Sequence, residues 1–144
     1  MFGPSQLSAD HDQQFIQIFF HHAMHDELDT FNGTYTKDLI PGKVTTEMWL
    51  TTRDQEILLT KAEAIGFFEL PDTLNRESGI GEFPDFGAQT IRIKHGPRDK
   101  TVVWFETTRD KRRFVVEDLR RLLIDIIRSK PEYKALPPAK GAYI

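Results

Sequence analysis

The stretch that decides the fold is GTYTKDLIPGKVTTEMWL, residues 33–50. Its two halves, residues 33–40 and 44–50, are rich in β-branched and aromatic residues, which favour strands. Pro41 and Gly42 lie between the halves and form a turn dipeptide. The stretch therefore predicts two antiparallel strands joined by a short turn.

A further strand precedes this pair. Residues 15–22, FIQIFFHH, are rich in strand-forming residues and predict a buried strand. Residues 23–32 are polar and acidic and end next to Asn32-Gly33, a turn signal, so we expect a loop there. The spacing favours a meander in which the strand at 33–40 pairs with both of its neighbours.

The period of the apolar residues changes after the third strand. Thr52 and Gln55 have the spacing of a capping box. Leu58 and Ala62 then recur at helical spacing, and Gly66 stands where a glycine commonly ends a helix. We expect a helix that Thr52 caps at its N-terminus and that ends before Gly66.

Residues 71–87, PDTLNRESGIGEFPDFG, predict a long loop. Loops of this length in compact domains are often functional or mobile. Phe83 and Phe86 are its candidate binding residues. They either fold back over the core as a lid, which we favour, or stand exposed as anchors for a partner.

The rest of the chain predicts a hairpin, residues 88–95 and 101–106, and a second helix, residues 110–129, with a wide apolar stripe. Pro131 suits the first turn of a short terminal helix. The element order is βββ-α-ββ-α. It predicts an α+β fold, an antiparallel five-stranded sheet with two main helices packed on one face. The other face of the sheet would then be open for binding.

The length of 144 residues fits one domain, which we place at residues 13–137 between flexible tails at 1–12 and 138–144. The absence of cysteine excludes disulfides, thiolate nucleophiles and cysteine-ligated metals. A net charge of −3 gives no reason to expect nucleic acid binding. No apolar run is long enough to span a membrane, so we expect a soluble protein. It would be cytoplasmic, or exported with its leader removed.

Histidines and carboxylates cluster near the first strand. His21, His22 and His25 lie close to Asp26 and Glu27 in the sequence, and such side chains are good zinc ligands. However, neighbouring residues on a strand point to opposite faces, and no HExxH spacing is present. The favoured interpretation is a polar strand end that leads into a loop. Metal binding is the weaker alternative, and we expect no cofactor.

Basic residues gather at the start of the second helix: Arg109, Lys111, Arg112 and Arg113. Cations at this end oppose the helix macrodipole, and a broken local rule sometimes marks a functional surface. Arg112 and Arg113 could therefore receive a phosphate or an acidic partner. The favoured interpretation is a solvated helix face of mixed charge.

No spacing in the chain marks a catalytic group. There is no GxSxG nucleophile motif, and no pair of loop carboxylates is spaced so as to converge. We therefore expect a non-catalytic binding domain. Its partner would be another protein, contacted through the open sheet face or the 71–87 loop. The alternative is a hydrolase that uses loop carboxylates and His25.

Residues 29–38, DTFNGTYTKD, resemble a motif of a family of uncharacterised, mainly bacterial proteins. Residues 66–72, GFFELPD, the hairpin with Trp104 and the final helix ending in residues 129–133, SKPEY, are also similar to that family. The resemblance spans roughly residues 15–137. It implies one domain and adds no catalytic residue.

A more distant similarity, in the order of elements, is to emfourin-type inhibitors of metalloproteases. These small sheet-and-helix proteins have a comparable segment with phenylalanine and proline after the first helix, but their N-terminal motif is not matched here. The similarity implies a protease-inhibitor-like protein as a further alternative, by analogy of fold only.

Overall fold

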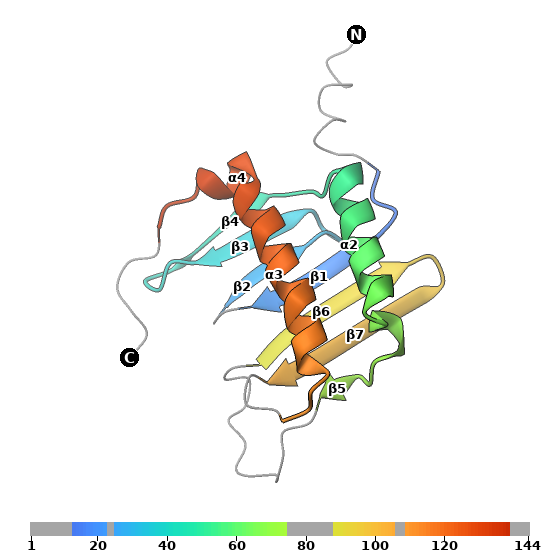
Figure 1. The fold of residues 1–144 in the computed structure, drawn as a ribbon. Helices are drawn as coiled ribbons and strands as arrows, with labels where there is room; N and C mark the ends of the chain where they lie inside the picture. Colours follow the sequence, from blue (N-terminus) through green and yellow to red (C-terminus); the bar gives the residue numbers. More distant parts are fainter. Residues whose placement is uncertain (1–12, 23–24, 75–87, 106–108, 139–144) are drawn as a thin grey trace.

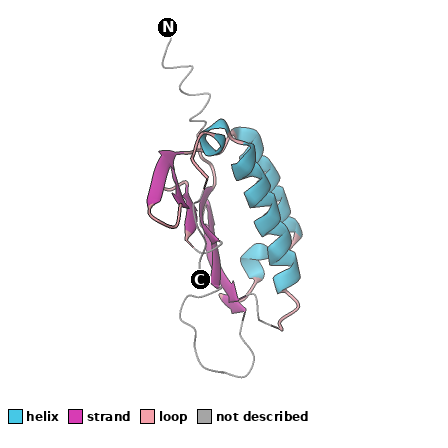
Figure 2. Cartoon of the chain, turned by 90° about the vertical axis from the view of Figure 1, so that its left-hand side faces the viewer, coloured by secondary structure: helices cyan, strands magenta, loops and turns pink. Residues whose placement is uncertain are grey.

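The computed structural model describes residues 13–22, 25–74, 88–105 and 109–138. It has two layers, one sheet and a layer of helices on one of its faces (Figures 1 and 2). The strands are β1 (Gln17–His22), β2 (Asp26–Asp29), β3 (Thr34–Asp38), β4 (Lys43–Glu47), β5 (Thr73–Leu74), β6 (Ala88–His95) and β7 (Arg98–Phe105). The helices are α2 (Thr52–Ala64), α3 (Arg113–Ser129) and α4 (Pro131–Lys134), with a 3₁₀ turn, η1 (Phe67–Glu69).

The strand order is β4-β3-β2-β1-β6-β7-β5. The α+β class is confirmed. The prediction of five antiparallel strands is wrong, because the described residues form a sheet of seven strands and β5 runs parallel to β7. The two additional strands fall in segments expected to be loops. The expected tails lie, apart from residue 138, outside the described residues.

The strand β2 also corrects the expected meander. It lies between β1 and β3, so β3 pairs with β2 and β4 rather than with β1. Its sequence, DELD, has one apolar residue, Leu28, which pairs with Phe20 of β1 and is fully buried. Pairing with a strand on either side and the burial of Leu28 hold this acidic segment extended, although acidic residues are depleted in strands.

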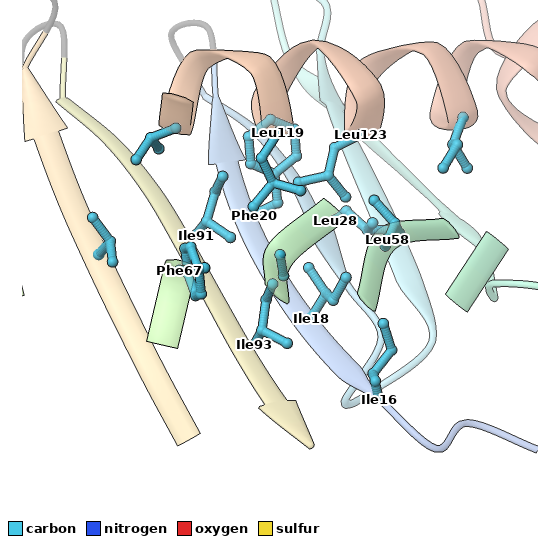
Figure 3. Packing of buried hydrophobic residues seen from close by; sticks show 14 of the residues in the cluster. Ile16, Ile18, Phe20, Leu28, Leu58, Phe67, Ile91, Ile93, Leu119 and Leu123 are labelled. Atoms are coloured by element: carbon cyan, nitrogen blue, oxygen red, sulfur yellow. The ribbon is translucent and has the colours of Figure 1, made fainter. Parts of the chain in front are cut away.

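The core lies between the sheet and the helices. Alternate residues of the central strands, such as Ile18 and Phe20 on β1 and Ile91 on β6, point towards the helices and are fully buried. Leu119 and Leu123 of α3 meet them from the other layer (Figure 3). The side chains that point the other way are left on a face that no described helix covers.

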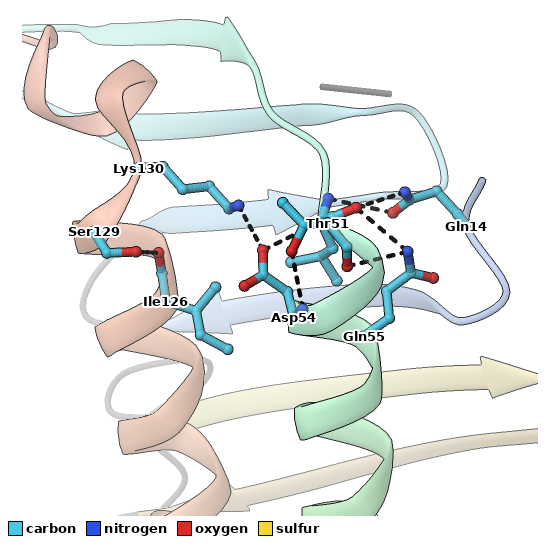
Figure 4. Close-up of polar contacts among 8 residues, drawn as sticks. Gln14, Thr51, Asp54, Gln55, Ile126, Ser129 and Lys130 are labelled. Atoms are coloured by element: carbon cyan, nitrogen blue, oxygen red, sulfur yellow. Dashed lines mark hydrogen bonds and ion pairs between the residues drawn. The ribbon is translucent and has the colours of Figure 1, made fainter. Parts of the chain in front are cut away.

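A capping box begins α2, one residue earlier than predicted. The Thr51 hydroxyl accepts the Asp54 N–H at 3.0 Å, and the Asp54 carboxylate accepts the Thr51 N–H at 3.0 Å (Figure 4). Gln55, the predicted partner, is fully buried instead. Its side-chain oxygen accepts the N–H groups of Phe15 and Ile16, at 2.7 and 3.1 Å, and so ties α2 to the chain entering β1.

Asp54 also forms an ion pair with Lys130, a residue 8% exposed, at 2.7 Å (Figure 4). We expect Asp54→Ala to lower the free energy of unfolding by about 2 kcal/mol, because the Thr51 N–H loses its carboxylate acceptor and a buried ammonium is left unpaired. Lys130→Met, made alone, removes the ammonium and leaves the capping box in place. It should cost about 1 kcal/mol or less. Urea unfolding of both variants tests this. Equal losses would show that the capping bond of the Asp54 carboxylate adds nothing beyond the ion pair.

The ends of the other helices follow their sequence signals in part. Gly66 has the left-handed φ of 69° expected after α2, which confirms its predicted role. Pro131 occupies the first turn of α4, as predicted. The helix α3 begins at Arg113 rather than near residue 110, because Asp110 bonds the N–H of Arg112 in a turn before the helix.

Candidate functional site: the uncovered face of the sheet

Figure 2 shows that one face of the sheet points away from the helices. The side chains on this face lie in rows that run across the strands. The strand register fixes these rows, because directly paired residues on neighbouring strands point to the same face. One row crosses all seven strands: Thr45, Thr36, Glu27, His21, Thr90, Val103 and Thr73. The next row contains Glu47, Thr34, Asp29, Phe19, Arg92 and Thr101.

Arg92 lies near the middle of the second row and is held from two sides. Its Nε and Nη2 atoms donate to the two carboxylate oxygens of Asp99 at 3.0 and 2.8 Å. Its guanidinium carbon lies 4.4 Å from the centre of the Phe31 ring, and Phe19 is its direct neighbour on β1. Together we call Phe19, Phe31, Arg92 and Asp99 the Arg92 patch.

The ion pair in the Arg92 patch keeps both groups charged. Hydrogen bonding to Arg92 lowers the pKa of the Asp99 carboxyl, and hydrogen bonding to Asp99 raises the pKa of Arg92. Both side chains are 40% exposed, so water screens the pair and its contribution to stability is small. Its main effect is to fix the plane of the guanidinium, because a bidentate pair has a defined geometry.

A turn after β2 places Phe31 beneath Arg92. The Asp29 carboxylate accepts the N–H of Phe31 at 2.9 Å and the N–H of Asn32 at 3.2 Å. It also accepts the side-chain amide of Asn32 at 2.8 Å. Gly33 follows with a φ of 75°, which ends the turn and starts β3. The DTFNG turn therefore holds the aromatic ring of Phe31 on the uncovered face.

A shallow depression of about 510 Å³ adjoins the Arg92 patch at the β7 end of the sheet. It is lined by Asp72, Thr73, Arg92, Asp99, Lys100, Thr101 and Val103. Lys100 donates to Asp72 at 2.7 Å, so each cation of the depression already has a carboxylate partner. The surface offers hydrogen-bond donors and acceptors in balance, which suits a polar partner better than a lone anion.

The histidine segment is divided between the two faces, as the sequence predicts for His21 and His22. His21 Nδ1 lies 2.9 Å from the Glu27 carboxylate on the uncovered face. His22 points into the helix side and is buried. His25 is exposed, and its ring makes an edge contact with His21. Among the residues that the structure describes, no three histidine or carboxylate side chains are grouped so as to hold a metal ion.

His22 belongs to a small polar cluster in the core. Its ring stacks on Phe20, and its Nε2 lies 3.3 Å from the Tyr35 hydroxyl. That hydroxyl donates to Asp26 at 3.3 Å, which leaves the Tyr35 oxygen to accept from Nε2. Burial, followed by the charge of Arg120, lowers the pKa of His22 to about 3. Burial also raises the pKa of Tyr35, with Asp26 adding to the effect. The side chains of His22 and Tyr35 are therefore both uncharged near pH 7.

The predicted basic site lies at the start of α3, in the helix layer. Arg112 pairs with Asp110 at 2.6 Å, and the resulting hydrogen bonds lower the pKa of Asp110 to about 2. The Arg113 guanidinium lies 4.5 Å from the centre of the exposed Phe114 ring. Asp110 offsets the unfavourable placement of these cations near the helix start. The structure does not bring them to the Arg92 patch, and Phe83 and Phe86 lie outside the described residues.

Sequence reasoning missed Arg92 and Asp99, although a signal for them exists. Alternation along residues 88–95 places Arg92 on the face opposite to Ile91 and Ile93. The hairpin register then pairs Arg92 with Thr101, two residues from Asp99 on the same face. The contact of Phe31 with Arg92 had no such signal, because it depends on β2, which the sequence did not predict.

No family model, no curated protein and no solved structure matches this chain. No helix among the described residues is long and apolar enough to cross a membrane.

Proposed function

We propose that this protein is a non-catalytic binding domain that contacts another protein through the uncovered face of its sheet. The observation that carries the proposal is the Arg92 patch, in which an arginine is held over an aromatic ring by a bidentate ion pair. Arginine and aromatic residues dominate the binding energy of protein interfaces. A guanidinium that is already fixed loses less conformational entropy on binding, which favours association.

The surroundings of the patch fit a protein partner. Threonine hydroxyls stand in both rows beside it, at Thr34, Thr90 and Thr101 among others. They can donate to or accept from a partner's backbone, and the paired charges leave no strong local field. This mixture of aromatic, arginine and polar groups is typical of the surfaces through which proteins contact one another.

The hydrolase alternative has less support from the geometry. Its carboxylates were expected in a loop, but Asp26 and Glu27 lie on β2, which sends them to opposite faces of the sheet. The protease-inhibitor alternative is one form of the binding-domain proposal, with a protease as the partner. Membership of the uncharacterised bacterial family stays a prediction, and the motif that suggested it supplies Phe31 to the patch.

A photo-crosslinking residue placed at Thr101, beside Arg92, tests the proposal in cells that make the protein. We expect an adduct with a defined cellular protein, and Arg92→Ala should reduce its yield about tenfold, which corresponds to a loss of about 1.4 kcal/mol in binding free energy. The same crosslinker at Thr60, exposed on α2, is the matched control. Arg92→Ala should change the stability by less than about 1 kcal/mol, because its ion pair is exposed.

Two results would count against the proposal. One is an adduct at Thr60 that equals the adduct at Thr101, which would place the contact on the helix layer. The other is an adduct at Thr101 that persists unchanged in Arg92→Ala, which would leave the Arg92 patch without a part in binding.

A further inference from the structure

The strand β4 forms one edge of the sheet, with β3 on its inner side (Figure 1). An edge strand offers a row of backbone N–H and C=O groups to any strand that can pair with it. The residues of β4, KVTTE, are rich in β-branched side chains and carry a positive charge at one end and a negative charge at the other. These features make the edge complementary to itself.

Two hydrogen bonds at the ends of the β3–β4 hairpin show which backbone groups point outwards. Met48 N–H donates to the Gly33 carbonyl at 2.9 Å, and Leu39 N–H donates to the Gly42 carbonyl at 2.7 Å. Hydrogen-bonded pairs alternate along an antiparallel ladder, so between these ends the bonds to β3 come from Val44 and Thr46. The N–H and C=O groups of Lys43, Thr45 and Glu47 therefore point away from β3, to the outside.

We infer that two copies of this chain pair through antiparallel β4 strands, with Thr45 of each copy opposite Thr45 of the other. In this register Lys43 lies opposite Glu47 of the second copy at both ends. All three outward-pointing residues then meet outward-pointing residues, which is the condition for hydrogen-bonded pairs. A shift by one residue in either direction would break both the hydrogen-bond pattern and the charge match.

The side chains support the same pairing. Lys43, Thr45 and Glu47 point to the uncovered face and are exposed, because their neighbours Val44 and Thr46 share the helix side with Tyr35. The Glu47 carboxylate accepts the Trp49 indole N–H at 2.9 Å, which orients it beside the strand end. Opposite charges that face each other across antiparallel strands stabilise the pairing.

The pairing is two-fold symmetric and goes beyond the proposed function. The same surface serves both copies, as in most homodimers, and the two sheets join into one. The two-fold axis is perpendicular to the sheet, so both uncovered faces lie on the same side. Each dimer would then present two Arg92 patches on one continuous surface. A five-residue edge buries less than stable interfaces do, so we expect weak dimerisation that depends on concentration.

Charge reversal at β4 tests the pairing by sedimentation equilibrium of the full chain from about 10 μM to 1 mM, a range that brackets a weak interface. Lys43→Glu and Glu47→Lys should each weaken self-association about tenfold, because two attractive pairs become repulsive. An equimolar mixture of the two variants should associate at least as well as the wild type, because every cross-chain pair is again opposite in sign. Lys111→Glu, the same charge change before α3, is the matched control and should associate like the wild type.

A backbone variant tests the hydrogen bonds separately. Thr45→Pro removes an N–H that points away from β3, so the chain should stay folded and become monomeric at every concentration used. Thr46→Pro removes an N–H bonded to β3 and should instead destabilise the fold. A monomeric wild type at 1 mM, or self-association that both reversals leave unchanged, would overturn the inference. Neither result bears on the Arg92 patch, which Arg92→Ala tests independently.

Discussion

Replacing Gly33 by alanine is expected to lower the free energy of unfolding by about 4 kcal/mol, the sum of backbone strain and steric overlap. Gly33 has a φ of 75°, a left-handed conformation that costs other residues about 1–2 kcal/mol. A β-carbon at this position would lie 2.1 Å from the Trp49 ring. The ring or the turn would have to move, and forced repacking of this kind costs about 1–3 kcal/mol.

Gly96 provides the matched control for this prediction. It also has a positive φ, 59°, but a β-carbon there would meet nothing within 4 Å. Gly96→Ala should therefore show the backbone strain alone, about 1–2 kcal/mol in urea unfolding. The difference between the two variants measures the overlap with Trp49. Equal losses would show that the indole ring moves aside at no cost.

A double-mutant cycle with Trp49→Ala gives a second measurement of the overlap. Once the ring is removed, Gly33→Ala should cost only its backbone strain. The coupling free energy between the two positions should then be about 2 kcal/mol, within the range found for residues in contact. Additive effects would mean that the close approach of Gly33 and Trp49 does not constrain the fold.

The sequence predicts well those elements whose signals are local. The strand β6 alternates apolar and polar residues, β1 and β7 carry runs of β-branched and aromatic residues, and α3 carries a continuous apolar stripe. Each of these elements therefore has a signal within its own sequence. Gly66 and Pro131 also act through their own backbone geometry, which needs no tertiary contact. Such features can be predicted from a single sequence.

The elements that were missed depend on their neighbours. The strand β2 has only Leu28 as an apolar residue and is held extended by its pairing with β1 and β3. The two-residue strand β5 exists because it pairs with β7. The capping box is shifted by one residue because Gln55 is drawn into bonds with Phe15 and Ile16, which are distant in the sequence. Pairing across the chain overrides local propensity in each case.

The candidate site was predictable in its location and not in its residues. One face of the sheet is left uncovered by the described helices, as the two amphipathic helices predict. The residues proposed for binding, Arg112 and Arg113, lie in the helix layer, whereas the Arg92 patch was not recognised. The basic residues at 109–113 are neighbours in the sequence, so their cluster can be recognised without a structure. A contact between Phe31 and Arg92, which come from different strands and turns, requires the sheet order to be known first.

The buried side chain of His22 is expected to make the fold less stable at acidic pH. Burial lowers the pKa of this side chain from its ordinary value of 6.5 to about 3, and the charge of Arg120 adds to the effect. Between these two pH values the unfolded chain binds a proton at this position and the folded chain does not. Stability therefore falls as the pH falls from about 6.5 towards 3, by at most about 1.4 kcal/mol per pH unit.

We expect His22→Phe to remove this loss, because phenylalanine does not titrate and can stack on Phe20 as the imidazole does. Relative to the variant, the wild type should lose about 3 kcal/mol between pH 7 and pH 4.5, and the difference should be constant above pH 7. Urea unfolding at pH intervals of about half a unit measures both curves. Carboxylates elsewhere titrate in both proteins and cancel in the difference. Parallel curves would contradict the prediction.

Tyr35→Phe tests whether burial or the hydrogen bond with Tyr35 keeps His22 uncharged. It removes the hydroxyl that lies 3.3 Å from His22 Nε2 and donates to Asp26, but it leaves the imidazole buried. Because burial is the largest cause of the lowered pKa, this variant should be less stable at every pH by about 1 kcal/mol and should keep most of the acid-dependent loss. If the loss disappears in Tyr35→Phe, the hydrogen bond rather than burial keeps His22 neutral, and burial is then not the main cause of its lowered pKa.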